Sequence, residues 1–299
     1  MVCVRVSDEA LAEIDSQGFV IVPGFLSANE VAAACAGLFT VFPPPDEYHA
    51  DPEKYAAFGT SQFAGLRNFP CASWEVNRLA FHPDLVNAAE RYLGTNDIEL
   101  YKFEVWAKYS GAIDYDQRHH RDFGNHSLVV PQANGSDRQM TTFILLSDVT
   151  ASDGPTAVVP LRFSRDLPMI PEQRDPKFGF ALADDSELRN VEVKVTGRAG
   201  SLFIYRTDVL HRGTSFRGEG RSRFATLADF KARGPRWTGR VAWPNQALSP
   251  HWVEAMERAT VRERDLFGFP PPGDPYWDAQ TLHDVGLRYP RMDLSPYQP

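Results

Sequence analysis

The fold is decided by one stretch that is apolar at both even and odd positions through its middle: Gln139-Met140-Thr141-Thr142-Phe143-Ile144-Leu145-Leu146-Ser147-Asp148-Val149. Side chains of a β-strand point alternately to its two faces, so this pattern predicts a central strand that is covered on both faces. Other short runs rich in β-branched and aromatic residues are bounded by turn residues and predict further strands. These runs are residues 19–22, 98–109, 156–160, 191–195, 201–205 and 223–230.

Helical patterns are confined mainly to the N-terminal third and to one later segment. Ser7 can cap a helix over residues 7–16, and Ser27 with Glu30 forms a capping box for a helix ending near Phe39. Residues 83–93 also have helical spacing, and Ser249 as cap with Pro250 at the first helical position predicts a helix over 250–266. Residues 43–72 predict a long ordered loop and 161–190 an excursion over the surface. Many short strands without βαβ alternation indicate a mainly β fold with helical cover, an antiparallel barrel or jelly roll.

The chain is long enough for one elaborated domain. Its 299 residues are 43% hydrophobic and 12% aromatic, which supplies a large core. Residues 269–299 are rich in Pro but contain enough Tyr, Trp and Leu to pack as an ordered wrap. We therefore expect a single domain over residues 1–299, with a core at about 10–235 and a C-terminal helix and wrapping tail at 236–299.

Charge and cysteine content exclude several classes of partner. The formal net charge is −8 and no long run of Lys or Arg occurs, which argues against nucleic acid or an anionic membrane and favours a small-molecule substrate. Cys3, Cys35 and Cys71 are odd in number and lack C-x-x-C spacing, so we expect reduced thiols in a cytoplasmic protein. Neither a signal peptide nor a membrane span is indicated.

The main candidate for chemistry is His119-His120-Arg121-Asp122, taken together with His211. On extended backbone, residues 120 and 122 point to the same face, so an imidazole and a carboxylate can close on one ion. His211 follows an apolar run, as a third ligand at the end of a buried strand should. Two histidines and one carboxylate form the ligand set of non-haem Fe(II) oxygenases. His119 must point to the opposite face, and we expect His126 to be a pocket or surface residue.

The order of motifs resembles the phytanoyl-CoA dioxygenase family of Fe(II)- and 2-oxoglutarate-dependent oxygenases over roughly residues 10–235. The motifs that carry the resemblance are Gly18-Phe19-Val20-Ile21-Val22-Pro23-Gly24-Phe25-Leu26-Ser27, Phe81-His82-Pro83-Asp84-Leu85 leading to Leu93-Gly94, His120-Arg121-Asp122, Leu146-Ser147-Asp148-Val149 through Asp153-Gly154-Pro155-Thr156 to Val159-Pro160, and His211-Arg212-Gly213-Thr214 with an Arg about ten residues beyond. Two departures are Leu161-Arg162-Phe163, where the family usually continues Ser-His after Pro-Gly, and His119, where it often has an aromatic residue. We expect the second departure to change the pocket wall.

The resemblance implies a double-stranded β-helix, a cupin-like jelly roll, that binds Fe(II) through His120, Asp122 and His211. It also implies that 2-oxoglutarate and O2 are cosubstrates, that succinate and CO2 are released, and that the outcome is hydroxylation of a small organic metabolite. A basic side chain would pair with the distal carboxylate of 2-oxoglutarate, and Thr156 and Thr214 are expected near it. We predict Arg223 for this role over Arg221, because Arg223 lies about 6–7 Å deeper along its strand and guanidinium offers a two-pronged donor.

Competing functions have weaker support in the sequence. A cupin enzyme that uses H-x-H and a serine hydrolase that uses G-x-S-x-G both lack their motif here. The alternative that we keep is a non-catalytic jelly-roll protein that binds a small molecule. Among the aromatic residues Trp74, Tyr101, Phe103 and Trp106, packing in the core is the default expectation and lining of a pocket the alternative. The sequence specifies neither the substrate nor the oligomeric state.

Overall fold

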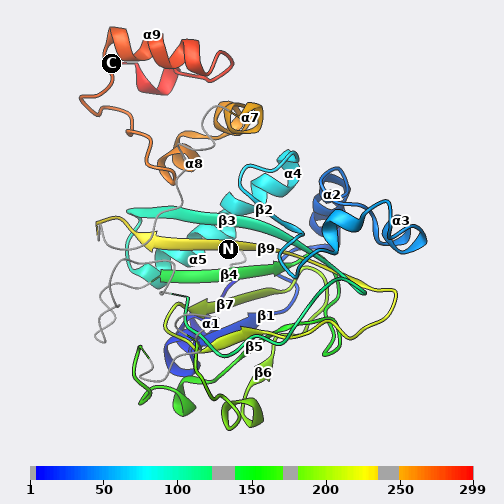
Figure 1. Cartoon of the computed structure of the whole chain (residues 1–299). Helices are drawn as coiled ribbons and strands as arrows, with labels where there is room; N and C mark the ends of the chain where they lie inside the picture. Colours follow the sequence, from blue (N-terminus) through cyan, green and yellow to red (C-terminus); the bar gives the residue numbers. More distant parts are fainter. Residues whose placement is uncertain (1–4, 123–138, 171–180, 235–248, 299) are drawn as a thin grey trace.

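The computed structural model describes residues 5–122, 139–170, 181–234 and 249–298 (Figure 1). The helices are α1 (Asp8–Gln17), α2 (Ala28–Leu38), α3 (Pro45–Ala50), α4 (Trp74–Asn77), α5 (Pro83–Leu93), α7 (Pro250–Arg258), α8 (Val261–Asp265) and α9 (Ala279–Arg288). The strands are β1 (Phe19–Val22), β2 (Leu66–Asn68), β3 (Ile98–Tyr109), β4 (Gln139–Leu145), β5 (Thr156–Val158), β6 (Val193–Lys194), β7 (Leu202–Arg206), β8 (His211–Gly213) and β9 (Ser222–Ala232). Short 3-10 turns are η1 (Ala56–Phe58), η2 (Arg78–Phe81), η3 (Leu161–Phe163), η4 (Leu188–Asn190) and η6 (Ser295–Tyr297).

The strands form two antiparallel sheets. The larger sheet has the order β1-β7-β4-β9-β3-β2, and the smaller has the order β6-β5-β8. The apolar stretch that begins at Gln139 becomes β4, which lies between β7 and β9 and is buried at nearly every position. The predictions of a mainly antiparallel β protein with helices, and of a central strand in this stretch, are thus confirmed.

Helices cover the large sheet and extend beyond one edge of it. The amphipathic helix α5 packs against β3, β4 and β9, and α1 packs against β1 and β7. The C-terminal helices α7, α8 and α9 stand beyond β3, with α9 on the far side of α7 and α8 from the sheets (Figure 1). Trp252 of α7 donates a hydrogen bond to the Tyr289 hydroxyl at 3.0 Å. The segment that carries α9 and η6 thus packs on α7 and α8, where Arg264 of α8 also donates to the Asp293 carbonyl oxygen at 3.3 Å.

Three predicted segments differ from the structure in their boundaries. The helix expected over 250–266 is two helices, because Thr260 and Glu263 form a capping box that starts α8 directly after the extended Ala259. The loop expected at 43–72 contains α3, η1 and the short strand β2. The strand expected at 191–195 is reduced to Val193–Lys194, because η4 and its C-cap occupy the residues just before it.

Two observations concern the cysteines and the membrane. Cys35 and Cys71 are free thiols, and Cys3 lies outside the described residues. No helix within the described part of the chain has the length and apolar character needed to cross a membrane.

Candidate metal centre and cosubstrate cavity

The three side chains predicted as metal ligands converge. His120 Nε2 lies 3.8 Å from Asp122 Oδ1, and His211 Nε2 lies 3.4 Å from Asp122 Oδ2. One nitrogen or oxygen from each residue falls within 4.8 Å of the others. The backbones of His120 and His211 exchange two hydrogen bonds, of 2.9 and 3.0 Å, in a single antiparallel bridge. This bridge brings two parts of the chain that are far apart in sequence to one place.

The orientation of both imidazole rings suits metal binding. His120 Nδ1 lies 2.9 Å from the Arg118 carbonyl oxygen, and His211 Nδ1 lies 3.2 Å from that of Val209. A carbonyl oxygen only accepts, so each Nδ1 carries the proton and each Nε2 lone pair faces the other ligands. The Tyr205 hydroxyl donates to Asp122 Oδ2 at 2.9 Å and fixes the carboxylate in the same way.

The pKa values of His120 and His211 also favour a cation between the three ligands. Burial, together with the neighbouring His211, lowers the pKa of His120 to about 4, so its ring is neutral at pH 7. Burial lowers the pKa of His211 as well, but the Asp122 carboxylate more than offsets this and the net shift is upward. Neutral imidazole is the form that binds metals, and a bound cation takes the place of the proton that Asp122 attracts.

A cavity of about 250 Å³ opens over the three ligands. Its walls come from both sheets and from the segments that precede β2 and His120. The lining side chains besides the ligands include Phe63, Leu66, Lys102, Glu104, Trp106, Gln117, Phe143, Thr156, Tyr205, Arg223 and Leu227. The cavity is therefore large enough for small molecules next to the candidate metal centre.

Arg223 and Arg221 lie in different surroundings. Arg223 lines the cavity and is 7% exposed; its guanidinium lies 5.4 Å from the Trp106 ring centre and donates to the Gly154 carbonyl oxygen. Burial lowers its pKa to about 10, so it stays positively charged at pH 7. Arg221 instead makes two hydrogen bonds, of 2.6 and 2.7 Å, to the Asp153 carboxylate, and its side chain is 44% exposed. Only Arg223 of the two is placed to meet an anion in the cavity.

The two threonines expected near 2-oxoglutarate are also separated. Thr156 lines the cavity. Thr214 is buried, donates from Oγ1 to the Pro155 carbonyl oxygen at 2.6 Å, and is not part of the cavity wall. Thr214 follows Gly213 at the end of β8. Because side chains alternate between the two faces of a strand, Thr214 points to the opposite face from His211.

Several charged and aromatic residues of the cavity did not stand out in the sequence. Lys102 lies 3.2 Å from Glu104 and 4.0 Å from Asp229, whose pKa is raised to about 7 by burial. The polar positions of β3 predicted a wetter strand face, and the structure shows that Lys102 and Glu104 of this face line the cavity. Phe63, which is 44% exposed, stacks on Trp106 at 5.3 Å between ring centres. Of the four aromatic residues considered above, only Trp106 lines the cavity.

His119 points away from the candidate metal centre, as alternation predicts. It is fully buried, and its two ring nitrogens each lie 3.0 Å from a carboxylate oxygen, of Asp185 and of Glu192. The expectation that His119 alters the pocket wall is therefore wrong, because it is absent from the cavity lining. The described residues of the predicted surface excursion over 161–190 are mostly exposed or half-buried, and Asp185 is an exception because its side chain is fully buried. His126 lies outside the described residues.

A site of two histidines and one carboxylate, set between antiparallel sheets beside a buried arginine, defines a mononuclear non-haem oxygenase class of enzyme. The sequence profile of the phytanoyl-CoA dioxygenase family matches residues 14–225, and the chain belongs to this family. None of the curated proteins matches the sequence.

Solved structures agree with this assignment. The epimerase SnoN, in complex with Fe3+, α-ketoglutarate and nogalamycin RO, is 25% identical with a TM-score of 0.54, covering 75% of this chain and 83% of its own. The carbocyclase SnoK from nogalamycin biosynthesis is 19% identical with a TM-score of 0.57, covering 81% and 90%. HygX from Streptomyces hygroscopicus, with nickel and 2-oxoglutarate bound, is 17% identical with a TM-score of 0.53, covering 76% and 87%. The family match, together with the likeness to SnoN, makes the protein an enzyme of the iron- and 2-oxoglutarate-dependent oxygenase superfamily, and the other two structures show the same fold.

Proposed function

We propose that the protein is an Fe(II)- and 2-oxoglutarate-dependent dioxygenase that hydroxylates a small organic metabolite and releases succinate and CO2. The observation that carries this proposal is the convergence of His120, Asp122 and His211 on one point beside a cavity that also contains Arg223. The two antiparallel sheets are consistent with a double-stranded β-helix, the arrangement that we propose for the core.

Each residue has a distinct part in this proposal. His120, Asp122 and His211 would hold iron through two nitrogens and one oxygen, a donor set that leaves other positions open. Iron with 2-oxoglutarate supplies the activation of O2 when bound. Arg223 pairs with the distal carboxylate of 2-oxoglutarate, with Thr156 on the same cavity wall. Tyr205 keeps Asp122 oriented through its hydrogen bond.

The substrate meets a cavity wall of mixed character. Lys102 and Glu104 offer one cation and one anion, while Phe63 and Trp106 offer stacked apolar rings near the opening. Such a wall suits a compact molecule that carries both polar and apolar groups. Screening candidate molecules for stimulation of succinate release is the direct search for it.

The experiment that tests the proposal combines anaerobic binding with turnover. Adding Fe(II) and 2-oxoglutarate without oxygen should produce a weak visible charge-transfer band, and oxygen should then yield succinate. A protein that shows the band but forms no succinate with any candidate would match the non-catalytic binding alternative.

Epimerisation is the second candidate outcome, because SnoN is described as an epimerase and is 25% identical to this chain. Labelled oxygen separates the two outcomes. Hydroxylation places one atom from O2 in the product, whereas inversion of a stereocentre leaves the product without label.

Halogenation is not expected from the native enzyme. A halide binds iron in place of a carboxylate ligand, and Asp122 fills that place here, held by Tyr205. Mass spectrometry of products formed in chloride buffer should find no chlorinated species, and a chlorinated main product would refute the assignment of Asp122 as a ligand.

A further inference from the structure

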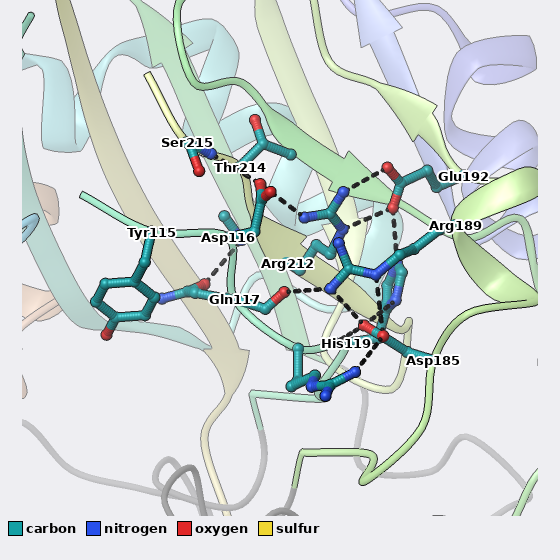
Figure 2. A network of polar contacts seen from close by, with 12 residues as sticks. Tyr115, Asp116, Gln117, His119, Asp185, Arg189, Glu192, Arg212, Thr214 and Ser215 are labelled. Carbon is teal, nitrogen blue, oxygen red and sulfur yellow. Dashed lines mark hydrogen bonds and ion pairs between the residues drawn. The ribbon is translucent and has the colours of Figure 1, made fainter. Parts of the chain in front are cut away.

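A group of ionisable side chains, most of them buried, lies on the face of the metal-binding segments opposite to the histidine ligands, and Figure 2 shows the contacts within this group. His119 directly precedes His120, and Arg212 directly follows His211. Neighbouring side chains on extended backbone point to opposite faces, so both lie behind the candidate metal centre. We name this group the rear cluster. Its members are His119, Asp185, Arg189, Glu192 and Arg212.

Glu192 is the member that joins the two metal-binding segments. Its Oε2 lies 3.0 Å from His119 Nε2 and 2.7 Å from Arg212 Nε. Its Oε1 accepts a second hydrogen bond of 2.7 Å from Arg212. A single carboxylate thus links the residue beside one histidine ligand to the residue beside the other, as Figure 2 shows.

Asp185 holds His119 from the other side. Its carboxylate accepts from the His119 backbone N–H and lies 3.0 Å from His119 Nδ1, both through Oδ2. Arg189 donates to the same carboxylate at 3.0 and 3.2 Å, and also donates to the Gln117 carbonyl oxygen at 3.3 Å. The His119 ring is therefore held at Nδ1 by Asp185, while its Nε2 faces the Glu192 carboxylate at 3.0 Å without the angles of a hydrogen bond. Both acids come from a third part of the chain.

Four of the five side chains of the rear cluster are buried. Those of His119 and Asp185 are 0% exposed and those of Glu192 and Arg212 are 7% and 6% exposed, whereas that of Arg189 is 31% exposed. Buried ion pairs add little net stability compared with apolar packing, but the loss of one partner leaves an uncompensated buried charge. Movement of one member away from the others is therefore costly, which suits a role in fixing geometry.

The backbone contacts between the two metal-binding segments are few. His120 and His211 exchange two hydrogen bonds in an isolated bridge, and the Gln117 N–H donates to the Gly213 carbonyl oxygen at 2.9 Å. β8 is only three residues long and pairs with β5. These backbone hydrogen bonds set the spacing of the segments, and the side-chain link through Glu192 adds a connection between the residues next to the two histidine ligands.

We propose that the rear cluster positions the two histidine ligands, and that Glu192 is the residue that fixes the angle between them. Glu192 and His119 are positioning residues that touch neither metal nor substrate. This inference rests on the proposed function, because it takes His120, Asp122 and His211 as the metal ligands.

The test measures binding of Co(II) to the full-length, metal-free protein without substrate or 2-oxoglutarate. Glu192→Gln should raise the Kd for Co(II) by about 10-fold or more, the usual effect of removing a group that orients a metal ligand. The visible absorption of bound Co(II), which reports ligand geometry, should change as well. The matched control is Glu187→Gln, the same exchange at an exposed position five residues earlier, which should keep the native Kd and spectrum.

A second variant, His119→Phe, removes the other end of the link and replaces it with an apolar ring. It keeps Glu192 paired with Arg212, so it carries the test if Glu192→Gln does not fold. Both changes break the same contact between His119 and Glu192. The Kd of the double variant for Co(II) should therefore be about equal to the higher of the two single-variant Kd values. Native Kd and spectrum in either folded variant, or fully additive effects in the double variant, would overturn the proposal.

Failure of the inference is distinguishable from failure of the proposed function. If the His211→Ala variant no longer binds Co(II) but the Glu192→Gln variant binds it with the native Kd, only the positioning role is refuted. If His211→Ala binds Co(II) as native protein does, the ligand assignment itself is refuted, and the positioning role with it.

Discussion

His211→Ala is expected to reduce Fe(II)-dependent decarboxylation of 2-oxoglutarate to the background of metal-free protein. The variant loses one of the three candidate ligands. The Nε2 of this ligand lies 3.4 Å from the Asp122 carboxylate, and its buried ring packs against Tyr205. Two remaining ligands hold iron weakly and no longer fix the open positions. The measurement is succinate formation with Fe(II), 2-oxoglutarate and oxygen, with and without a chelator.

His251→Ala is the matched control, because His251 is an exposed histidine on α7 that belongs neither to the candidate metal centre nor to the cavity lining. It should retain native activity. Full activity in His211→Ala, or in chelator-treated native protein, would show that the metal centre has been assigned to the wrong residues.

Arg223→Ala is expected to raise the KM for 2-oxoglutarate about 100-fold, equivalent to ~3 kcal/mol, the upper range for a hydrogen-bonded contact to a charged group. The reason is the position of Arg223 in the cavity wall, where it is buried and positively charged and its guanidinium donates to the Gly154 carbonyl oxygen. Arg223→Lys should give an intermediate KM, because an ammonium keeps the charge but lacks the planar two-pronged donor.

Arg221→Ala is the matched control for this experiment. Arg221 is two residues earlier, directly before β9 begins at Ser222, and its guanidinium is already paired with Asp153. Its removal should leave the KM for 2-oxoglutarate near native, although loss of the ion pair can lower stability. The reverse ranking of the two variants would refute the assignment of Arg223.

The larger elements of the fold were predictable because their signals are local. Phe19–Val22 and Ile98–Tyr109 are strands over the predicted residues, since β-branched and aromatic runs between turn residues suffice to define them. The division of the helix at Ala259 also has a local signal, the capping box of Thr260 and Glu263. The prediction of one helix over 250–266 did not use this signal. The short strand β2 had none, because its three residues form a strand only by pairing with β3.

The candidate site was predictable where its residues sit in a short motif and hidden where they depend on distant partners. The H-x-D spacing identifies His120 and Asp122 as candidates, and the position of His211 after a buried apolar run identifies it as the third. Asp185 looked like part of a charged surface segment, yet its partner His119 is 66 residues away. Sequence spacing carries no information about such a contact, and a buried acid is distinguishable from an exposed one only when its cationic neighbours are known.

Several residues assigned to the reaction centre stand on different backbone from Phe63 of the cavity wall. His211, Tyr205 and Arg223 belong to paired strands and His120 is bridged to His211, whereas Phe63 belongs to the irregular stretch between η1 and β2. Irregular segments accept substitution and insertion more readily than paired strands do. Divergence within the family can therefore exchange the molecule that is recognised while conserving the reaction centre. For directed evolution, the stretch around Phe63 is the place to diversify first, because changes there leave the strand scaffold intact.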